Sequence, residues 1–233
     1  MLFRSLIWEN DIERGPERGA THIAVVRTQL ARHDFSNYEC VLVGGGRAPL
    51  DRPKNVITTW GMTETGSGVV YDGLPLPGVE ITTINGEICV DSPTLFRSYR
   101  NTPRPEIFDQ SGRGWFPTGD GGSFVDGRLS VFGRLQYVIS TGGEKVWPED
   151  LESVLHTVPG VRDVGVTGVD DPQWGQRIVA LVVSDRPHID EELRSVAEES
   201  IGPWAKPKEI RYVVALPRTD NGKLQRHSLN NLF

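Results

Sequence analysis

Cysteine and methionine are scarce in this 233-residue chain, which contains two of each. Cys40 and Cys89 lie in apolar runs without any CxxC or Cys/His spacing. The sequence therefore favours buried, reduced thiols over a disulfide framework or a cysteine-based metal site. Reduced thiols are typical of intracellular proteins, so we expect a cytoplasmic location.

Basic runs, long apolar runs, internal repeats and low-complexity segments are also missing. A net charge of -6 argues against a protein that binds a phosphate backbone, so we expect no nucleic-acid partner. The opening apolar stretch MLFRSLIW is too short for a signal peptide or a membrane span, and charged residues follow at once. We therefore expect no membrane partner.

The first part of the chain has the pattern of a parallel sheet. THIAVVR (residues 21–27), YECVLVGG (38–45) and NVITTW (55–60) are apolar runs typical of buried strands. Short crossovers between such strands favour parallel pairing. From about Val79 the pattern becomes antiparallel, and we expect a β-hairpin section that forms a small barrel or sandwich.

Two dipeptides indicate the antiparallel pairing. Asn85-Gly86 and Asp126-Gly127 are strong signals for two-residue hairpins. After Arg134 helical and strand patterns alternate over about a hundred residues, the usual size of a domain. A helix is expected to begin at Pro148. We expect an incomplete α/β N-terminal domain (1–133) and a small, mobile α+β C-terminal domain (134–233).

Three motifs occur in a fixed order: TTWGMTET (58–65), the segment from Trp115 to Pro148, and PRTDNGKLQR (217–226). In the middle segment Asp120 follows Thr-Gly, and a carboxylate held in a tight turn can accept two hydrogen bonds from a vicinal diol. Arg134, one hairpin later, can reach a phosphate of the same ligand. Together the motifs resemble those of the adenylate-forming acyl-CoA synthetase (AMP-binding) family, over roughly residues 20–233.

The resemblance implies separate roles within the TTWGMTET segment. Trp60, where the family usually has Tyr, would pack on adenine, with Gly61 and Met62 lining the nucleotide. Thr63 would contact the α-phosphate and take part in catalysis with Glu64, which would also hold Mg²⁺. A carboxylate suits a hard cation. An ordinary loop after a strand is the alternative explanation.

Further roles follow from the other two motifs. Asp120 would hold both ribose hydroxyls, and Arg134 would contact ribose or phosphate. Lys223 would be the catalytic lysine that bridges the carboxylate substrate and the α-phosphate. Gly142 and Gly143 would line the path of the pantetheine arm of CoA. The structural alternatives are a turn cap, a surface charge and a solvated lysine.

Three further positions complete the comparison with the family. Gly45 and Gly46 resemble glycines that line the acyl and adenine pockets, although their spacing lacks the pattern of a dinucleotide fold. Gln136 stands where the family usually has a charged hinge residue, Asp or Lys. It keeps the polarity but loses the charge, and domain rotation stays an expectation.

Three local runs, VVRTQLARH, VLVGGGRAPL and STGGEKVWPEDLE, resemble the 2-succinylbenzoate–CoA ligase branch of menaquinone biosynthesis. This resemblance implies an acid–thiol ligase that uses ATP, Mg²⁺, CoA and an aryl or acyl carboxylate. Two alternatives stay open: another aryl or acyl-CoA ligase, or a truncated, non-catalytic fragment that binds nucleotide or CoA.

The second alternative rests on the absence of one motif. The family has a Ser/Thr/Gly-rich phosphate loop ending in Lys before the position of residue 20, and this sequence lacks it. We therefore expect a chain that is poorly active alone. It would act as a homo-oligomer or with a complementing N-terminal half.

Overall fold

The computed structural model describes residues 12–30, 32–44, 52–220 and 222–232. The chain divides into two compact units. The N-terminal unit holds the described residues up to Thr118 together with Gly122–Val131, and the C-terminal unit holds Gly119–Gly121 and the residues from Phe132 onward. The domain boundary expected between residues 133 and 134 stays a prediction.

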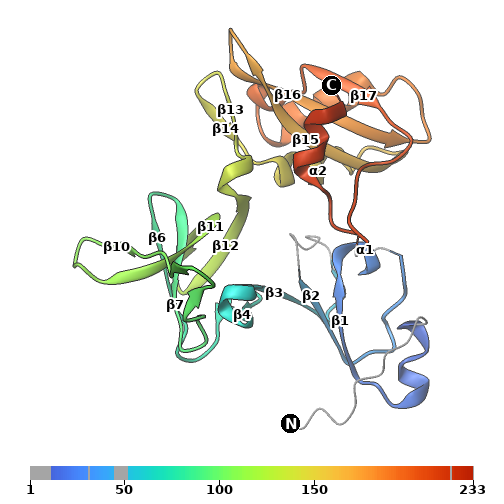
Figure 1. The fold of residues 1–233 in the computed structure, drawn as a ribbon. Coiled ribbons are helices and arrows are strands. Elements are labelled where there is room, and N and C mark those ends of the chain that lie inside the picture. The colour runs from blue at the N-terminus through green and yellow to red at the C-terminus, as the bar shows by residue number, and fades with distance from the viewer. Residues whose placement is uncertain (1–11, 31, 45–51, 221, 233) are drawn as a thin grey trace. The chain divides into compact units, whose positions relative to one another are not determined.

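The first sheet of the N-terminal unit has the strand order β1-β2-β3-β4-β5 (Figure 1). Its first three strands are parallel, which confirms the α/β expectation, and β4 turns back antiparallel to β3. Val41 and Val56 pack with Phe35 and Tyr38 on one face. The elements are β1 (His22–Val26), α1 (Arg27–Leu30), β2 (Cys40–Gly44), β3 (Val56–Met62), β4 (Ser67–Tyr71) and β5 (Leu74–Pro75).

The second sheet of this unit has the order β10-β11-β7-β6, and β12 pairs with β11. Both expected hairpin turns are present, with positive φ at Asn85 and Gly86 and at Asp126 and Gly127, as mirror-image two-residue turns require. The strands are β6 (Glu80–Ile84), β7 (Glu87–Asp91), β10 (Ile107–Phe108), β11 (Gly114–Val125) and β12 (Arg128–Arg134), with β8 (Ser98–Tyr99) and β9 (Thr102–Pro103) as a separate ribbon.

The expectation of a barrel in this section is wrong for the part of the chain that the structure describes. Closure requires the two edge strands to pair with each other, and β6 and β10 do not. The edge strand β10 has only two residues, Ile107 and Phe108, too few to complete a barrel wall.

The C-terminal unit is built on the sheet β14-β13-β16-β15, with β17 pairing parallel to β16. Helix α2 begins at Pro148, as expected, with Glu149 and Asp150 in its first turn, where acidic side chains are favourable. The elements are β13 (Ile139–Thr141), β14 (Glu144–Val146), α2 (Pro148–Leu155), β15 (Val161–Asp171), β16 (Gly175–Ser184), α3 (Asp190–Ser200) and β17 (Glu209–Tyr212).

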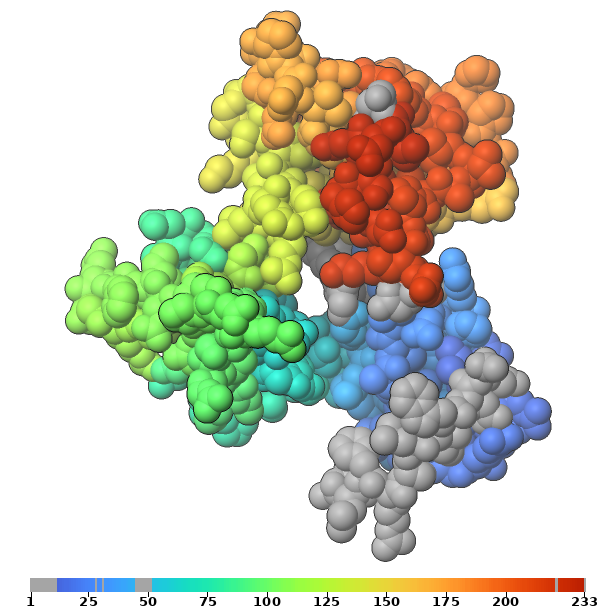
Figure 2. All heavy atoms as spheres, viewed as in Figure 1, coloured from blue at the N-terminus to red at the C-terminus, as the bar shows by residue number. Residues whose placement is uncertain are grey.

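Alternation along β16 explains how both faces of this sheet are covered. Ile178 and its neighbours at every second position pack with α2 and α3, through side chains such as Leu151 and Leu193. Leu181 faces the other way and packs with Leu216 and Leu229. The end of the chain thus lies on the opposite face from the helices, and it is visible as the red surface of this unit in Figure 2.

Three local features complete the fold. β17 ends at Tyr212 although the apolar run EIRYVVAL (209–216) continues beyond it, and Val214 is almost fully exposed. Both cysteines are free; Cys89 is buried as expected, whereas Cys40 is partly exposed. Burial raises the pKa of the Cys89 thiol to about 11. No helix in the described ranges is long and apolar enough to cross a membrane.

Candidate functional site

The TTWGMTET segment forms the end of β3 and the turn after it. Trp60 and Met62 are partly buried against a hydrophobic cluster that includes Val70 and Ile88. A side chain at Gly61 would overlap the carbonyl oxygen of Ser67, so glycine is required for the close approach of β4. The indole of Trp60 thus contributes to packing, and its role toward adenine stays a prediction.

Glu64 lies in the 3₁₀ turn Thr63–Thr65 that follows β3. Its Oε1 accepts a hydrogen bond of 3.0 Å from the hydroxyl of Tyr99, and its carbonyl accepts one of 2.8 Å from the N–H of Phe96. The rings of Phe96 and Tyr99 are in contact, with centroids 4.6 Å apart. These contacts fix the Glu64 carboxylate, whereas the neighbouring Thr63 is exposed.

Glu64 is the carboxylate that the TTWGMTET segment offers to a metal. Within the described ranges no group of three or more His, Cys, Asp or Glu side chains could hold a metal ion. Mg²⁺ is commonly bound through one or two carboxylates together with substrate phosphates. Glu64 therefore fits a cation that arrives with a nucleotide.

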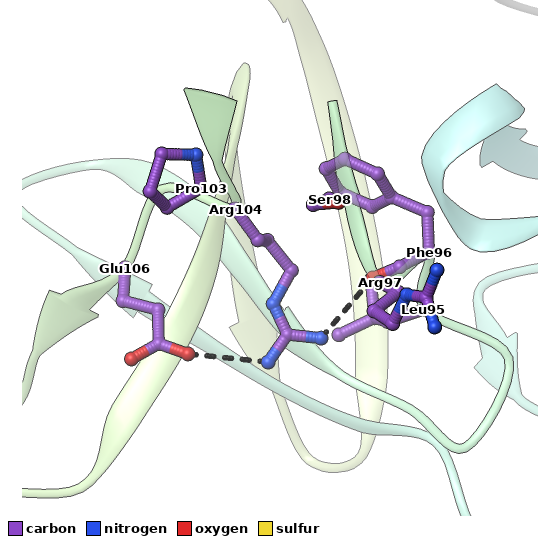
Figure 3. A pocket seen from close by; sticks show the side chains of 7 residues that line it. All are labelled: Leu95, Phe96, Arg97, Ser98, Pro103, Arg104 and Glu106. Carbon is purple, nitrogen blue, oxygen red and sulfur yellow. Dashed lines mark hydrogen bonds and ion pairs between the residues drawn. The ribbon is translucent and has the colours of Figure 1, made fainter. Parts of the chain in front are cut away.

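A hollow of about 690 Å³ lies beside this segment (Figure 3). It is lined by residues 95–98 and by Pro103, Arg104 and Glu106. Arg104 spans it, donating to the carbonyl of Phe96 at 3.3 Å and to Glu106 Oε1 at 3.2 Å. No site residue predicted from the sequence is among the residues that line this hollow.

A second hollow, of about 310 Å³, lies on the first sheet. Its lining includes Ala24 from β1, Leu42 and Gly44 from β2, Thr59 from β3 and Tyr71 from β4. Parallel sheets are normally covered on both faces, yet Ala24 is exposed here. The predicted Gly45 and Gly46 directly follow this lining but lie outside the described residues.

Asp120 and Arg134 form an ion pair in the C-terminal unit, with 2.9 Å between Asp120 Oδ1 and Arg134 Nε. Asp120 is buried, whereas the Arg134 side chain is about half exposed. The expected Thr-Gly-Asp turn is wrong as secondary structure, because these residues lie within β11. The strand is nevertheless irregular there, since Gly119 has φ +73°. The structure thus joins a buried acceptor to an accessible guanidinium.

Gly142 and Gly143 form the turn of the β13–β14 hairpin, with φ of +60° and +90°. The Gly142 N–H donates to the carbonyl of Trp174 at 2.9 Å. Trp174 belongs to the turn between β15 and β16, so the glycine hairpin is held at that end of the sheet. Gly143 has open space around it.

Lys223 lies in an exposed loop that follows β17. Gly222 has φ +81°, and its N–H donates to the carbonyl of Thr219 at 2.7 Å. Arg218 binds Asp163, near the start of β15, through two hydrogen bonds of 3.0 and 2.7 Å. This geometry is a turn that presents an exposed lysine, and the catalytic role of Lys223 stays a prediction.

The glycine hairpin and the Lys223 loop lie at opposite ends of the β15–β16 hairpin. Thr141 pairs with Gly175, which in turn pairs with Asp171 at the far end of β15. The Lys223 loop is tied to Asp163, eight residues earlier, or about 26 Å along an extended strand. In Figure 1 the two projections leave the C-terminal unit on different sides.

A buried charge network stands beside the Lys223 loop and was not foreseen from the sequence. Arg226 donates to Glu152 Oε1 at 2.6 Å, to Glu152 Oε2 at 3.0 Å and to Glu149 Oε1 at 3.1 Å. Its guanidinium also lies 5.6 Å from the ring centre of Tyr137. Burial raises the pKa of Glu152, and the hydrogen bonds from Arg226 oppose that rise. The network ties the end of the chain to α2.

The predicted site residues are divided between the two units. Trp60, Gly61, Met62, Thr63 and Glu64 belong to the N-terminal unit. Asp120, Arg134, Gly142, Gly143 and Lys223 belong to the C-terminal unit, where the ion pair joins the first two. Three additional residues lie beside these sets: Tyr99, which binds Glu64, and Arg218 and Arg226, which flank Lys223 in the sequence. Arg218 and Arg226 lie in a recognised motif, but their partners are far away in sequence.

Comparison with known proteins gives consistent matches. The AMP-binding enzyme C-terminal domain family matches residues 150–223. A probable 2-succinylbenzoate–CoA ligase from Mycobacterium tuberculosis is 38% identical over 237 residues, covering 92% of this chain and 61% of the relative. The 2-succinylbenzoate–CoA ligase of Bacillus pumilus is 35% identical over 250 residues, covering 91% of this chain and 51% of the relative.

A solved structure matches at the level of the fold and the sequence. The o-succinylbenzoate CoA synthetase of Bacillus subtilis, in complex with the acyl-adenylate intermediate OSB-AMP, has a TM-score of 0.80 and 31% identity, covering 94% of this chain and 53% of that chain. This chain therefore spans about half to three fifths of the length of these relatives. Residues 150–223 thus match the C-terminal domain of the AMP-binding enzymes, and over the part that it spans the chain is similar to the 2-succinylbenzoate–CoA ligases.

Proposed function

We propose that this chain is part of an ATP-dependent carboxylate–CoA ligase that acts through an acyl-adenylate, with 2-succinylbenzoate as the carboxylate. The observation that carries the proposal is the placement of the Lys223 loop and the Gly142-Gly143 hairpin at opposite ends of β15–β16. A two-step ligase needs different groups in each step, and rotation of one unit can exchange them. The names of the relatives suggest the substrate.

In the first step a carboxylate oxygen of the substrate attacks the α-phosphorus of ATP, and pyrophosphate leaves. The Lys223 ammonium would stabilise the negative charge that develops between the two reactants. Asp120 would accept hydrogen bonds from the ribose hydroxyls, with Arg134 beside it. The ion pair between these two side chains keeps the carboxylate oriented before a nucleotide binds.

In the second step the CoA thiolate attacks the acyl carbon of the mixed anhydride, and AMP leaves. The Gly142-Gly143 turn has no side chains, and Gly143 has open space around it, so the narrow pantetheine arm could pass close to the backbone. Bound Mg²⁺ supplies charge neutralisation at the phosphates. Glu64, held by Tyr99, is the carboxylate that would bind it.

The decisive experiment replaces Lys223 with alanine in the form of the protein that catalyses pyrophosphate exchange, either the chain alone or the chain with its complementing half. We expect pyrophosphate exchange with 2-succinylbenzoate to fall roughly a hundredfold or more, because a positioned charge of this kind lowers the barrier by a few kcal/mol. Thioester formation from preformed acyl-AMP should change far less. Lys206→Ala, in an ion pair on the same unit, is the matched control. Similar losses in both half-reactions would contradict the assigned role.

A second candidate is a ligase for another aryl or acyl carboxylate. A substrate panel in the exchange assay distinguishes it, since the rank order of carboxylates would then place another acid above 2-succinylbenzoate. A fragment without turnover would show binding of AMP or CoA but no exchange with any acid. The cytoplasmic location expected from the cysteine pattern stays a prediction.

We also propose a protein partner for the N-terminal unit, either a second copy or a complementing N-terminal half. The support is the hollowed face of the first sheet, where Ala24 is exposed on a parallel strand. Dye binding or self-association of the purified chain would agree with this proposal. Full pyrophosphate exchange by a monodisperse, monomeric chain would contradict it.

A further inference from the structure

The Lys223 loop, defined as residues 217–220 and 222–226, is held at its start by Arg218. The Nε and Nη2 atoms of Arg218 donate to the two carboxylate oxygens of Asp163 on β15, at 3.0 and 2.7 Å. Its Nη1 atom donates to the carbonyl of Gly222 at 2.7 Å. A two-point fork onto a carboxylate fixes both distance and orientation. Arg218 therefore connects the sheet to the residue that precedes Lys223.

The loop is held at its end by Arg226, which is only 10% exposed. Both of its terminal nitrogens bind Glu152 of α2, and Nη1 also donates to the carbonyl of Val166 on β15 at 3.0 Å. Glu152 in turn accepts the N–H of Val166 at 2.7 Å. A helix and a strand are thus both tied to a position three residues after Lys223.

Between these anchors the backbone closes on itself. The Thr219 N–H donates to the Lys223 carbonyl at 2.9 Å, and the Lys223 N–H donates to Thr219 Oγ1 at 3.1 Å. Leu224 forms an isolated bridge with Arg218. The backbone of Lys223 is consequently fixed on both sides while its side chain is exposed.

We propose that Arg218 and Arg226 are positioning residues that hold the Lys223 loop in one conformation and so fix the direction from which the ammonium reaches its target. The inference rests on the catalytic role proposed above for Lys223. Neither arginine touches the reacting atoms; each acts through the backbone of the loop. An ammonium on a flexible four-carbon stem has many orientations, and fixing the backbone removes part of that freedom.

Hydrogen–deuterium exchange of the full chain tests the ordering directly. In Arg218→Ala the amides of Thr219, Gly222 and Lys223 should exchange at least tenfold faster, while amides of β16 keep their protection. Arg218→Lys, which keeps the charge but loses the fork, should give an intermediate effect. Arg186→Ala is the control, since Arg186 makes a similar two-point contact with Glu192 on the same unit.

The two half-reactions test the consequence for catalysis. Arg218→Ala and the milder Arg226→Lys should lower pyrophosphate exchange at least tenfold and thioester formation from acyl-AMP less than threefold. A purely structural role would lower both equally and would overturn the inference. An unchanged rate of hydrogen–deuterium exchange at the loop amides in both variants would also overturn the inference.

The proposed function fails by a different result. If Lys223→Ala keeps full pyrophosphate exchange, the catalytic role of Lys223 is wrong, whatever the loop amides show. Suppose that Lys223→Ala abolishes pyrophosphate exchange, whereas Arg218→Ala loosens the loop without slowing pyrophosphate exchange. The proposed function then stands, and the positioning inference is overturned.

Discussion

Replacing Arg226 with methionine removes the centre of the buried charge network and keeps much of the side-chain volume. Arg226 is 10% and Glu152 14% exposed, so both charges are largely shielded from water. Removing one partner of a buried pair typically lowers the free energy of unfolding by about 3–5 kcal/mol, because the remaining charge is left without compensation. We expect a loss of that size in the C-terminal unit at pH 7.

The loss should depend on pH in a defined direction. Without Arg226 the burial of Glu152 is opposed mainly by the Val166 N–H, so the pKa of Glu152 rises further above its ordinary value. Above a pH of about 4.3 the unfolded chain has released this proton while the folded variant retains it. The folded state binds more protons, so the stability of the variant falls as pH rises and is better preserved near pH 4.

Hydrogen exchange of β15 and β16 amides is the suitable assay, because it reports on the C-terminal unit alone in a chain with two units. A loss of about 3–5 kcal/mol corresponds to protection factors lower by roughly a hundredfold to several thousandfold. Adding Glu152→Gln to Arg226→Met should restore part of the protection. The exposed pair Arg186–Glu192 is the control, and Arg186→Met should leave the protection of these amides nearly unchanged because solvent screens that pair. A loss below about 1 kcal/mol for Arg226→Met at pH 7 would refute the reasoning.

Three further outcomes are expected. Gly61→Ala should lower the unfolding free energy by about 1–3 kcal/mol in urea titrations, because the new methyl group would overlap the Ser67 carbonyl, and an unchanged midpoint would contradict the close approach of β4 to Gly61. Cys89, with its pKa raised to about 11 by burial, should react with a thiol reagent at pH 8 only after unfolding, and rapid labelling of the native chain would contradict its burial. Gln136→Pro, in the 3₁₀ turn Leu135–Tyr137, should slow thioester formation more than adenylation, because it fixes φ at the proposed hinge; equal survival of both steps would remove Gln136 from that role.

Features of the fold that depend on local chemistry were predictable from the sequence. The turns at Asn85-Gly86 and Asp126-Gly127 have the positive φ values that their residue types favour. Helix α2 begins at Pro148, where the missing N–H costs nothing. The parallel pairing of β1, β2 and β3 followed from their apolar runs and short crossovers.

Features that depend on distant partners were not predictable in the same way. The barrel prediction was wrong because the pairing of two edge strands depends on the arrangement of the whole sheet and not on the sequence of either strand. The turn expected at Asp120 was wrong because β11 continues through Gly119, even though Gly119 has a positive φ. The strand after Glu209 ends early at Tyr212, although the apolar run continues to Leu216.

The candidate site shows the same limit. The motifs named Asp120 and Arg134 as members of one site, and the structure adds the ion pair between them. PRTDNGKLQR named Lys223, but nothing within the motif identifies Asp163, 55 residues from Arg218, as the carboxylate that holds the loop. The partners of Arg226 on α2 are 74 and 77 residues away. The sequence around a charged residue does not identify its ion-pair partner in the fold.

The separation of the glycine hairpin and the Lys223 loop along β15 also governs timing under the proposed function. An intermediate held at one end lies far outside hydrogen-bond reach of the groups at the other, about 26 Å away along the strand. The lysine that assists formation of the mixed anhydride is then absent when the thiol arrives, so it cannot promote the reverse reaction with pyrophosphate. The distance along this β-hairpin thereby keeps the adenylation step and the thioester-forming step apart, because the groups that serve them cannot act on one intermediate at the same time.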